Sequence, residues 1–324
     1  MATLEEIQQP IADKVRRYET FITEILHSDS GYVSSICNYI LANRGKQMRP
    51  LLVLLSAALH GEIGTRSYLG ASLVEMLHTA SLIHDDVVDE STERRGQLSV
   101  NAIFNNKVAV LTGDYLLATS LVHAELTNSH QIIRLVSSLG QDLADGELLQ
   151  LSNVSNHSFS ETVYFDVIRK KTAALFAACT EAAAYSVGVS EEEVKLARLL
   201  GEYIGICFQI KDDIFDYFDS KEIGKPTGND MLEGKLTLPV LYALNRANDN
   251  QAAEIALKVK EGTATLAEIA RLIAFTKENG GIEYAVRTMN AYKQKAFGLL
   301  ASLPDSAICV ALRSYLDYVV DREK

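Results

Sequence analysis

The distribution of proline constrains the fold of this chain more than any other feature. The sequence has 324 residues and five prolines, at positions 10, 50, 226, 239 and 304, so residues 51–225 contain none. Proline disrupts helix interiors, whereas turns and sheet edges use it often. A proline-free stretch of this length therefore favours an all-α fold.

Apolar residues repeat with the spacing of helices over the same region. Four segments carry them three and four residues apart, which places them on one helix face: 66–90, 129–151, 160–187 and 191–219. The sequence contains no internal repeat and no linker-like segment. We therefore expect residues 1–324 to form a single-domain bundle of roughly ten or more helices.

Composition and charge exclude several classes of protein. Hydrophobic residues make up 48% of the chain, enough for a large core, and the net charge of −11 disfavours a nucleic-acid surface, which needs a basic patch. The four cysteines form no CxxC pair, so we expect reduced thiols. The start has no apolar signal core, and no run of about 18 apolar residues occurs. We expect a cytoplasmic protein without a transmembrane segment.

Two aspartate-rich motifs follow apolar helical segments. In "HDDVVDESTERRG", Asp85 and Asp89 flank Asp86 and share a helix face about 6 Å apart. Facing carboxylates repel one another unless a cation lies between them, and an oxygen-only ligand set suits Mg²⁺. One such motif is most often a solvated helix face, but two at the ends of apolar helices indicate a metal site. The second motif, "KDDIFDYFD", repeats the pattern with Asp212, Asp213 and Asp216.

Basic residues lie beside these motifs or in glycine-containing loops. Each of them alone would be an ordinary surface charge. Arginine suits a diphosphate because it offers bidentate donors, and a helix N-terminus is a natural anion site. Together with metal-binding carboxylates they predict a diphosphate site. They are Lys46 and Arg49 in "RGKQMRP", Arg94 and Arg95 in "ERRG", Lys171 in "RKKTAALF", and Lys225 and Lys235 in "GKPTGNDMLEGKLTLP".

These motifs resemble those of the trans-polyprenyl diphosphate synthases, the head-to-tail prenyltransferase family, over about residues 30–320. Both aspartate motifs, "GKQMRP", "RRG", "KT", "FQxxDDxxD" and "GKPTGND…EGKLTLP" occur in the family's order. The chain departs from the family at Arg44, where a second glycine is common, and at Gln47, where a basic residue is common. The resemblance implies the isoprenoid synthase fold, an all-α bundle around a central cavity.

The resemblance also implies the reaction and the role of each residue. Isopentenyl diphosphate attacks the carbocation left when an allylic diphosphate ionises, with Mg²⁺ as cofactor and a homodimer as the usual assembly. The metal ligands would be Asp85, Asp89 and Asp212, supported by Asp86, Asp213 and Asp216. The allylic diphosphate would be held by Arg94, Lys171 and Lys225. Isopentenyl diphosphate would be held by Lys46, Arg49, His78 and Arg95. Thr172 and Gln209 would place oxygen dipoles near the cation, and Lys235 would approach the leaving group.

The length of the product is predicted from the helix that precedes the first motif. In the family, residues four and five before the first aspartate face the product tunnel, and bulky aromatics there close it early. Here these residues are Ser81 and Ala80, so the tunnel is expected to continue past Met76 and Leu73. The floor is expected near Leu135 or Val136. We therefore expect a long-chain all-trans product, about C30–C50 with octaprenyl favoured, serving as a quinone side chain and drawing the enzyme to the membrane surface.

Other readings remain open at this point. A geranylgeranyl or farnesyl diphosphate synthase shares all the motifs. A class I terpene cyclase shares one DDxxD, but it normally has a different second metal motif. A non-catalytic subunit that retunes an active partner usually loses one aspartate motif, whereas both are intact here. An HD-type phosphohydrolase would need further histidine and aspartate ligands, and the other histidines are scattered.

Overall fold

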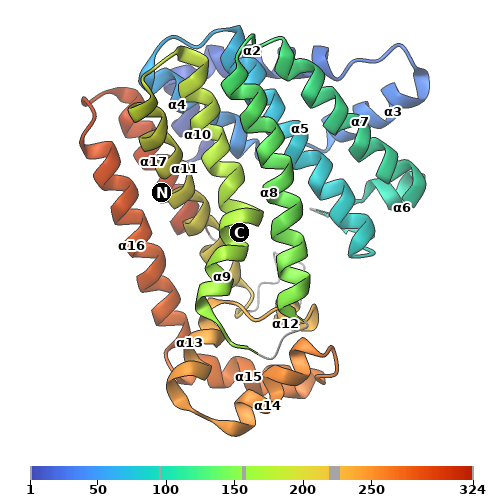
Figure 1. The fold of residues 1–324 in the computed structure, drawn as a ribbon, viewed down its shortest axis with the longest axis vertical. Helices are drawn as coiled ribbons and strands as arrows, with labels where there is room; N and C mark the ends of the chain where they lie inside the picture. The colour runs from blue at the N-terminus through green and yellow to red at the C-terminus, as the bar shows by residue number, and fades with distance from the viewer. Residues whose placement is uncertain (1, 95, 155–157, 219–226, 323–324) are drawn as a thin grey trace. The chain divides into compact units, whose positions relative to one another are not determined.

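The structure is a computed structural model and describes residues 2–94, 96–154, 158–218 and 227–322. Helices account for most of these residues (Figure 1). The strands found in the described ranges are β1 (Glu93–Arg94) and β2 (Gln97–Leu98), a short antiparallel pair. The all-α prediction is confirmed.

The chain divides into two compact units, each assembled from three stretches of sequence. Unit 1 comprises Met1–Gln141, Leu175–Gly201 and Leu303–Tyr315, and unit 2 comprises Asp142–Ala174, Glu202–Ser302 and Leu316–Lys324. Neither unit is a contiguous segment. The single-domain organisation of residues 1–324 stays a prediction.

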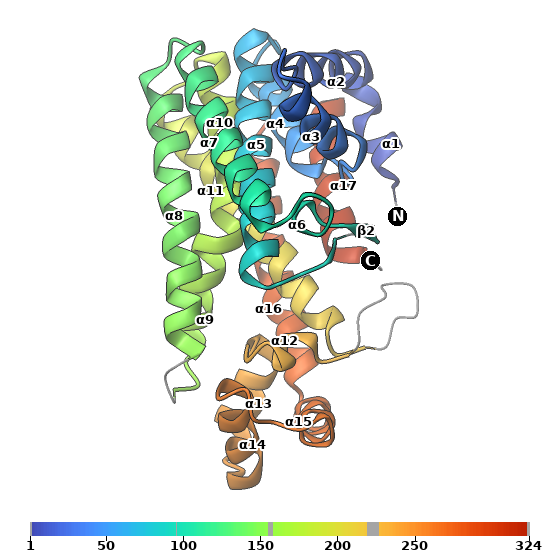
Figure 2. The ribbon, with the colours of Figure 1, turned by 90° about the vertical axis from the view of Figure 1, so that its right-hand side faces the viewer.

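Unit 1 contains the N-terminal helices and β1–β2. Its elements are α1 (Leu4–Gln8), η1 (Gln9–Ile11), α2 (Ala12–Ile25), α3 (Gly31–Ala42), α4 (Met48–His60), α5 (Thr65–Val88), α6 (Val100–Phe104), α7 (Asn106–Glu125), the first part of α8 (His130–Val154), nearly all of α10 (Ala174–Val187), the first part of α11 (Glu191–Phe215) and most of α17 (Ala307–Asp321). Helix α5 packs mainly against α7 and α4, and it runs beside α7 in Figure 2.

The core of unit 1 depends on small side chains as well as large ones. Leu73, Met76 and Ala80 of α5 are buried, and the alanines of α10 from Ala177 to Ala184 are at most 2% exposed. A Cβ atom at Gly201 would lie 2.3 Å from the carbonyl oxygen of Phe176, so α10 and α11 approach closely only because residue 201 has no side chain. Burial of this apolar surface stabilises the unit.

Unit 2 contains the following elements: the second part of α8, α9 (Glu161–Ile168), η2 (Arg169–Ala173), the second part of α11, α12 (Asn229–Leu232), α13 (Leu238–Ala247), α14 (Asn250–Lys260), α15 (Leu266–Glu278), α16 (Gly281–Ala301) and the end of α17. Helix α13 packs against α15 and α16, and α14 packs against α15. The helix expected over 160–187 is interrupted by η2, a π-helical turn that separates α9 from α10.

Two further expectations concern the cysteines and the membrane. The four cysteines are buried free thiols, and burial raises the pKa of Cys207 to about 12. Among the helices of the described residues, none combines the length and the apolar character needed to cross a membrane.

Candidate active site

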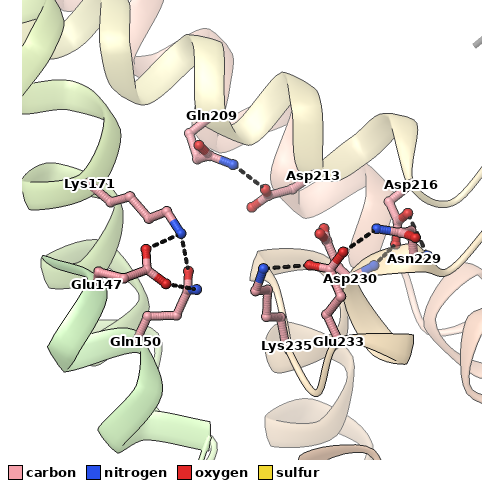
Figure 3. A network of polar contacts seen from close by, with 10 residues as sticks. All are labelled: Glu147, Gln150, Lys171, Gln209, Asp213, Asp216, Asn229, Asp230, Glu233 and Lys235. Atoms are coloured by element: carbon pink, nitrogen blue, oxygen red, sulfur yellow. Dashed lines mark hydrogen bonds and ion pairs between the residues drawn. The ribbon is translucent and has the colours of Figure 1, made fainter. Parts of the chain in front are cut away.

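The second aspartate motif lies at the end of α11, in unit 2 (Figure 3). Its middle residue, Asp213, is 2% exposed and accepts two hydrogen bonds. The Tyr164 hydroxyl donates to Oδ2 at 2.5 Å, and the Gln209 amide donates to Oδ1 at 2.8 Å. Both carboxylate oxygens of Asp213 are therefore engaged by neutral donors of the protein.

Gln209 links Asp213 to Thr172, which lies in the π-helical turn. The Thr172 hydroxyl donates to Gln209 Oε1 at 2.6 Å, so its proton is already used. A hydroxyl has one donor and two acceptor lone pairs. Thr172 can consequently offer an electron-rich oxygen to a ligand, which suits a positively charged carbon.

The flanking aspartates of this motif remain half-buried. Asp216 accepts the backbone N–H groups of Asn229 at 2.8 Å and Asp230 at 3.2 Å, and so fixes the start of α12. Asp212 accepts from the guanidinium of Arg322 at 2.6 Å. Arg322 is 8% exposed and also lies over the ring of Phe208, so the cation is itself held in place.

Burial shifts the pKa values of two groups in this cluster, Asp213 and Tyr164. Burial raises the pKa of the Asp213 carboxyl well above its ordinary value, the charge of Asp230 adds to the rise, and the hydrogen bonds from Tyr164 and Gln209 oppose it. Burial and the neighbouring Asp213 charge also raise the pKa of the Tyr164 phenol. Tyr164 is therefore protonated at neutral pH and acts as a donor.

The two predicted lysines of unit 2 that lie in described residues have acidic partners (Figure 3). Lys171 forms an ion pair with Glu147 and donates to Gln150 Oε1 at 3.4 Å. Lys235 forms an ion pair with Glu233 at 2.5 Å. Lys225 lies outside the described residues.

These side chains border a pocket of about 200 Å³ within unit 2. Its lining includes Lys171, Thr172, Gln209, Asp213 and Lys235, which are the residues that the resemblance assigns to catalysis together with the middle aspartate. Cations and carboxylates therefore meet in one hollow. The lysines of such a pocket can bind an anion directly. Its carboxylates can bind a metal cation that in turn binds the anion.

The first aspartate motif lies at the end of α5, in unit 1. Asp85 is half-buried, Asp89 is exposed, and Asp86 is 3% exposed. Arg94 of β1 donates to Asp86 Oδ1 from Nε at 2.8 Å and from one terminal nitrogen at 2.7 Å. Arg95 lies outside the described residues.

The residues predicted to bind isopentenyl diphosphate also lie in unit 1. Lys46 is exposed in the segment before α4, and Arg49, in the first turn of α4, has its guanidinium carbon 5.0 Å from the centre of the Phe176 ring. His78 of α5 is buried at 7% exposure and borders a pocket of about 90 Å³, which Asp86 and Arg94 also line. Of the residues predicted to bind isopentenyl diphosphate, this pocket places His78 beside the first motif.

The predicted tunnel positions lie on the same helix. Ala80 and Met76 are fully buried, while Ser81 is half-buried and donates its hydroxyl to the carbonyl of His78 at 2.9 Å. The expected floor residues, Leu135 and Val136, are buried in α8. Their roles in chain length stay predictions.

Each motif, taken by itself, is a possible metal site. In the described ranges, no three histidine, cysteine or acidic side chains gather closely enough to bind an ion by themselves. The donors are all carboxylate oxygens, which fit a hard divalent cation. The partial exposure of Asp85, Asp89, Asp212 and Asp216 leaves oxygen atoms within reach of solvent.

Several residues of these clusters were not predicted from the sequence. Glu147 and Gln150 are three residues apart in "GELLQL", a spacing that puts both on one helix face, and that was the available signal. Tyr164 precedes Thr172 by two helical turns. Arg322 stands near the end of the chain, where no motif marks it.

Comparisons with known proteins identify the family. The polyprenyl synthetase family model matches residues 30–276. The chain is 36% identical over 323 residues to an octaprenyl diphosphate synthase of Haemophilus influenzae, covering 99% of this chain and 98% of that protein.

Solved structures give the same result. A geranylgeranyl pyrophosphate synthase from Bacteroides thetaiotaomicron is 65% identical with a TM-score of 0.87, covering 98% of this chain and 99% of that one. A polyprenyl synthase from Caulobacter crescentus, complexed with calcium and isoprenyl diphosphate, is 32% identical with a TM-score of 0.91, covering 99% and 98%. The chain belongs to the polyprenyl synthetase family of prenyltransferases.

Proposed function

We propose that the chain condenses isopentenyl diphosphate with an allylic diphosphate, head to tail, and needs Mg²⁺ to do so. The observation that supports this best is common to the two aspartate motifs. Each buries its middle aspartate against protein donors and leaves the flanking aspartates partly exposed. Oxygen donors of this kind, together with phosphate oxygens, are the ligands of Mg²⁺.

The residues of this chain would then have the following roles. Lys171, Lys225 and Arg94 bind the allylic diphosphate, and Lys235 lies near the leaving group. Thr172, whose proton is donated to Gln209, turns a lone pair toward the electron-poor carbon. Bound Mg²⁺ would stabilise the negative charge that develops on the departing diphosphate. Lys46, Arg49, His78 and Arg95 would hold isopentenyl diphosphate.

We propose a long-chain all-trans product of about six to ten isoprene units, octaprenyl favoured. Ala80 and Ser81 are too small to close a tunnel along α5, and the Haemophilus relative is an octaprenyl diphosphate synthase. One observation favours a second candidate, a product of four units: the Bacteroides protein at 65% identity is a geranylgeranyl pyrophosphate synthase.

Incubation of the purified protein with Mg²⁺, labelled isopentenyl diphosphate and farnesyl diphosphate tests both proposals. A ladder that ends between six and ten units supports the long-chain product, and Ala80→Tyr should then shorten it. A stop at four units supports the geranylgeranyl candidate. A full-length, folded protein that elongates no allylic primer contradicts the catalytic proposal and favours a regulatory subunit.

We also propose a homodimer. Helix α7 carries an exposed apolar stripe formed by Leu111, Tyr115 and Val122, which are 67%, 38% and 64% exposed. Their spacing places them along one side of the helix, where they would be shielded from water by the same surface of a second copy. Sedimentation of the wild type and of Leu111→Glu tests this. A wild-type monomer, or a variant that still dimerises, contradicts it.

A further inference from the structure

We propose that Glu147 and Gln150 of α8 are positioning residues for Lys171, which they fix in place before the diphosphate arrives. Neither residue lies in the family's sequence motifs quoted above. The inference rests on the proposed function, in which Lys171 binds the allylic diphosphate.

The first observation is a closed triangle of polar contacts (Figure 3). The Lys171 ammonium is ion-paired with the Glu147 carboxylate and donates to Gln150 Oε1 at 3.4 Å. The Gln150 amide nitrogen in turn donates to Glu147 Oε1 at 3.2 Å. Each of the three groups therefore contacts both others, and a displacement of one strains the other two.

The second observation concerns the backbone. A Cβ atom at Gly146 would lie 2.9 Å from the backbone nitrogen of Lys171 and 3.0 Å from Cβ of Lys170. The π-helical turn can approach α8 this closely because residue 146 is glycine. One segment of α8, residues 146–150, thus holds Lys171 at its backbone and at its ammonium group.

This arrangement prepares a flexible side chain for binding. An ammonium group has three donors, of which two are directed at Glu147 and Gln150 among the described residues. Lysine has a long stem and loses about 2 kcal/mol of rotamer entropy when it is fixed. Fixing Lys171 in the folded protein removes this cost from the binding step.

A neighbouring ion pair provides the contrast. Lys170 and Asp145 lie 3.5 Å apart, and their side chains are 43% and 48% exposed, against 30% and 25% for Lys171 and Glu147. The Lys170 pair joins the same two segments but is more exposed to solvent. Loss of an exposed pair has little effect, so Asp145→Ala is the matched control.

The test is a double-mutant cycle on Glu147 and Lys171. The dissociation constant of the unreactive thiolo analogue of farnesyl diphosphate is measured by calorimetry in Mg²⁺ for Glu147→Ala, Lys171→Ala and the double variant. We expect Glu147→Ala to weaken binding about tenfold and the double variant to be no weaker than Lys171→Ala. Glu147→Gln, which keeps an acceptor for the ammonium, should recover about half of the loss in free energy.

The kinetic readout separates positioning from general damage. Glu147→Ala should raise the KM for the allylic diphosphate and leave the KM for isopentenyl diphosphate within about twofold, since Lys171 contacts the former. Asp145→Ala should match the wild type. Additive effects in the cycle, or an equal rise in both KM values, would overturn the inference.

A glycine pair covers the case in which Glu147→Ala does not fold. Gly146→Ala should weaken analogue binding, whereas Gly140→Ala, in open space on the same helix, should not. Equal binding by both variants would overturn the inference. A wild-type protein that neither binds the analogue nor makes product contradicts the proposed function itself, whereas an active wild type with a silent Glu147→Ala contradicts this inference alone.

Discussion

The first aspartate motif, at the end of α5, and the second, at the end of α11, both bury their middle carboxylate but surround it with different partners. Asp86 is held by a cation, the guanidinium of Arg94. Asp213 is held by two neutral donors, Tyr164 and Gln209. The comparison shows that the same three-aspartate spacing can be supported by an ion pair in one unit and by a neutral hydrogen-bond chain in the other.

The difference affects what each motif can do next. Arg94 is a predicted diphosphate ligand that already contacts Asp86, so a ligand on Arg94 would be coupled directly to the first motif. In the second motif the chain from Tyr164 ends at Thr172, which is predicted to face the reacting carbon. With these predicted roles, the first motif would act on the diphosphate and the second on the carbocation.

The largest expected effect tests what the motifs share. Asp85→Asn and Asp212→Asn should each lower kcat about 10²- to 10³-fold, because each removes a charged ligand from the proposed metal site. Unfolding of both variants is measured as well, because Asp212→Asn also weakens the ion pair with the buried Arg322. Product formation at saturating substrates is the measurement, and the exposed Asp29 supplies the control Asp29→Asn. A variant with wild-type kcat would remove its motif from the metal site.

The next effect tests the difference between the middle aspartates. Asp86→Asn should lower the free energy of unfolding by about 1.5–3 kcal/mol, because it loses charge-assisted hydrogen bonds from Arg94. Asp213→Asn should cost less, about 1 kcal/mol, because its partners Tyr164 and Gln209 are neutral and no cation is left without a counter-ion, as Arg94 is in Asp86→Asn. Urea unfolding of both variants gives the comparison. Equal losses of unfolding free energy in the two variants would show that a charged and a neutral partner stabilise the middle aspartate equally.

A smaller effect on kcat is expected when the hydrogen-bond chain around Asp213 loses one neutral donor. Tyr164→Phe removes one hydrogen bond of about 1 kcal/mol, which corresponds to about a fivefold fall in kcat if Asp213 and Gln209 position Thr172. The KM for isopentenyl diphosphate should not change. Tyr284→Phe, which breaks a hydroxyl-to-carboxylate bond with Glu161 elsewhere in unit 2, is the control. A Tyr164→Phe enzyme with unchanged kcat would show that the hydrogen bonds from Tyr164 to Thr172 do not affect the reaction.

The smallest effect concerns the flanking aspartate of the second motif. Arg322 occupies one oxygen of Asp212, so it should compete with a metal ion for that carboxylate. Arg322→Gln should lower the half-saturating Mg²⁺ concentration about threefold. Titration of activity with Mg²⁺ measures this. A higher requirement would show that Arg322 orients Asp212 for the metal instead of competing with it.

The sequence predicted much of this, for reasons that differ by residue. Proline spacing and apolar periodicity predicted the helices, because both report directly on backbone conformation. The aspartates and Lys171 were found because they occur in short, ordered motifs. The single helix expected over 160–187 is interrupted by η2, since a π-helical turn leaves no mark in apolar spacing.

The residues that contact the second aspartate motif could not be predicted, because they are far from it in the sequence. Tyr164 and Asp213 are 49 residues apart, and Arg322 and Asp212 are 110 apart. Neither pairing follows from local spacing. Glu147 and Gln150 shared a helix face, but a helix face with acidic and amide groups is usually solvated, so only the contact with Lys171 distinguishes it.

The π-helical turn has a consequence for how the length of this chain can vary. Such a turn contains one residue more than an α-helical turn. The turn takes up this extra residue, so Tyr164 and Thr172, eight residues apart, lie on one helix face as residues seven apart do in an α-helix, and both reach the Gln209–Asp213 pair of α11. Deletion of Lys170 from the turn would therefore restore α-helical winding and keep α9 and α10 in register, whereas deletion of one residue in the middle of α10 would rotate the residues that follow by about 100°. In a deletion library, folded members should therefore be found at the turn and be missing in the middle of α10.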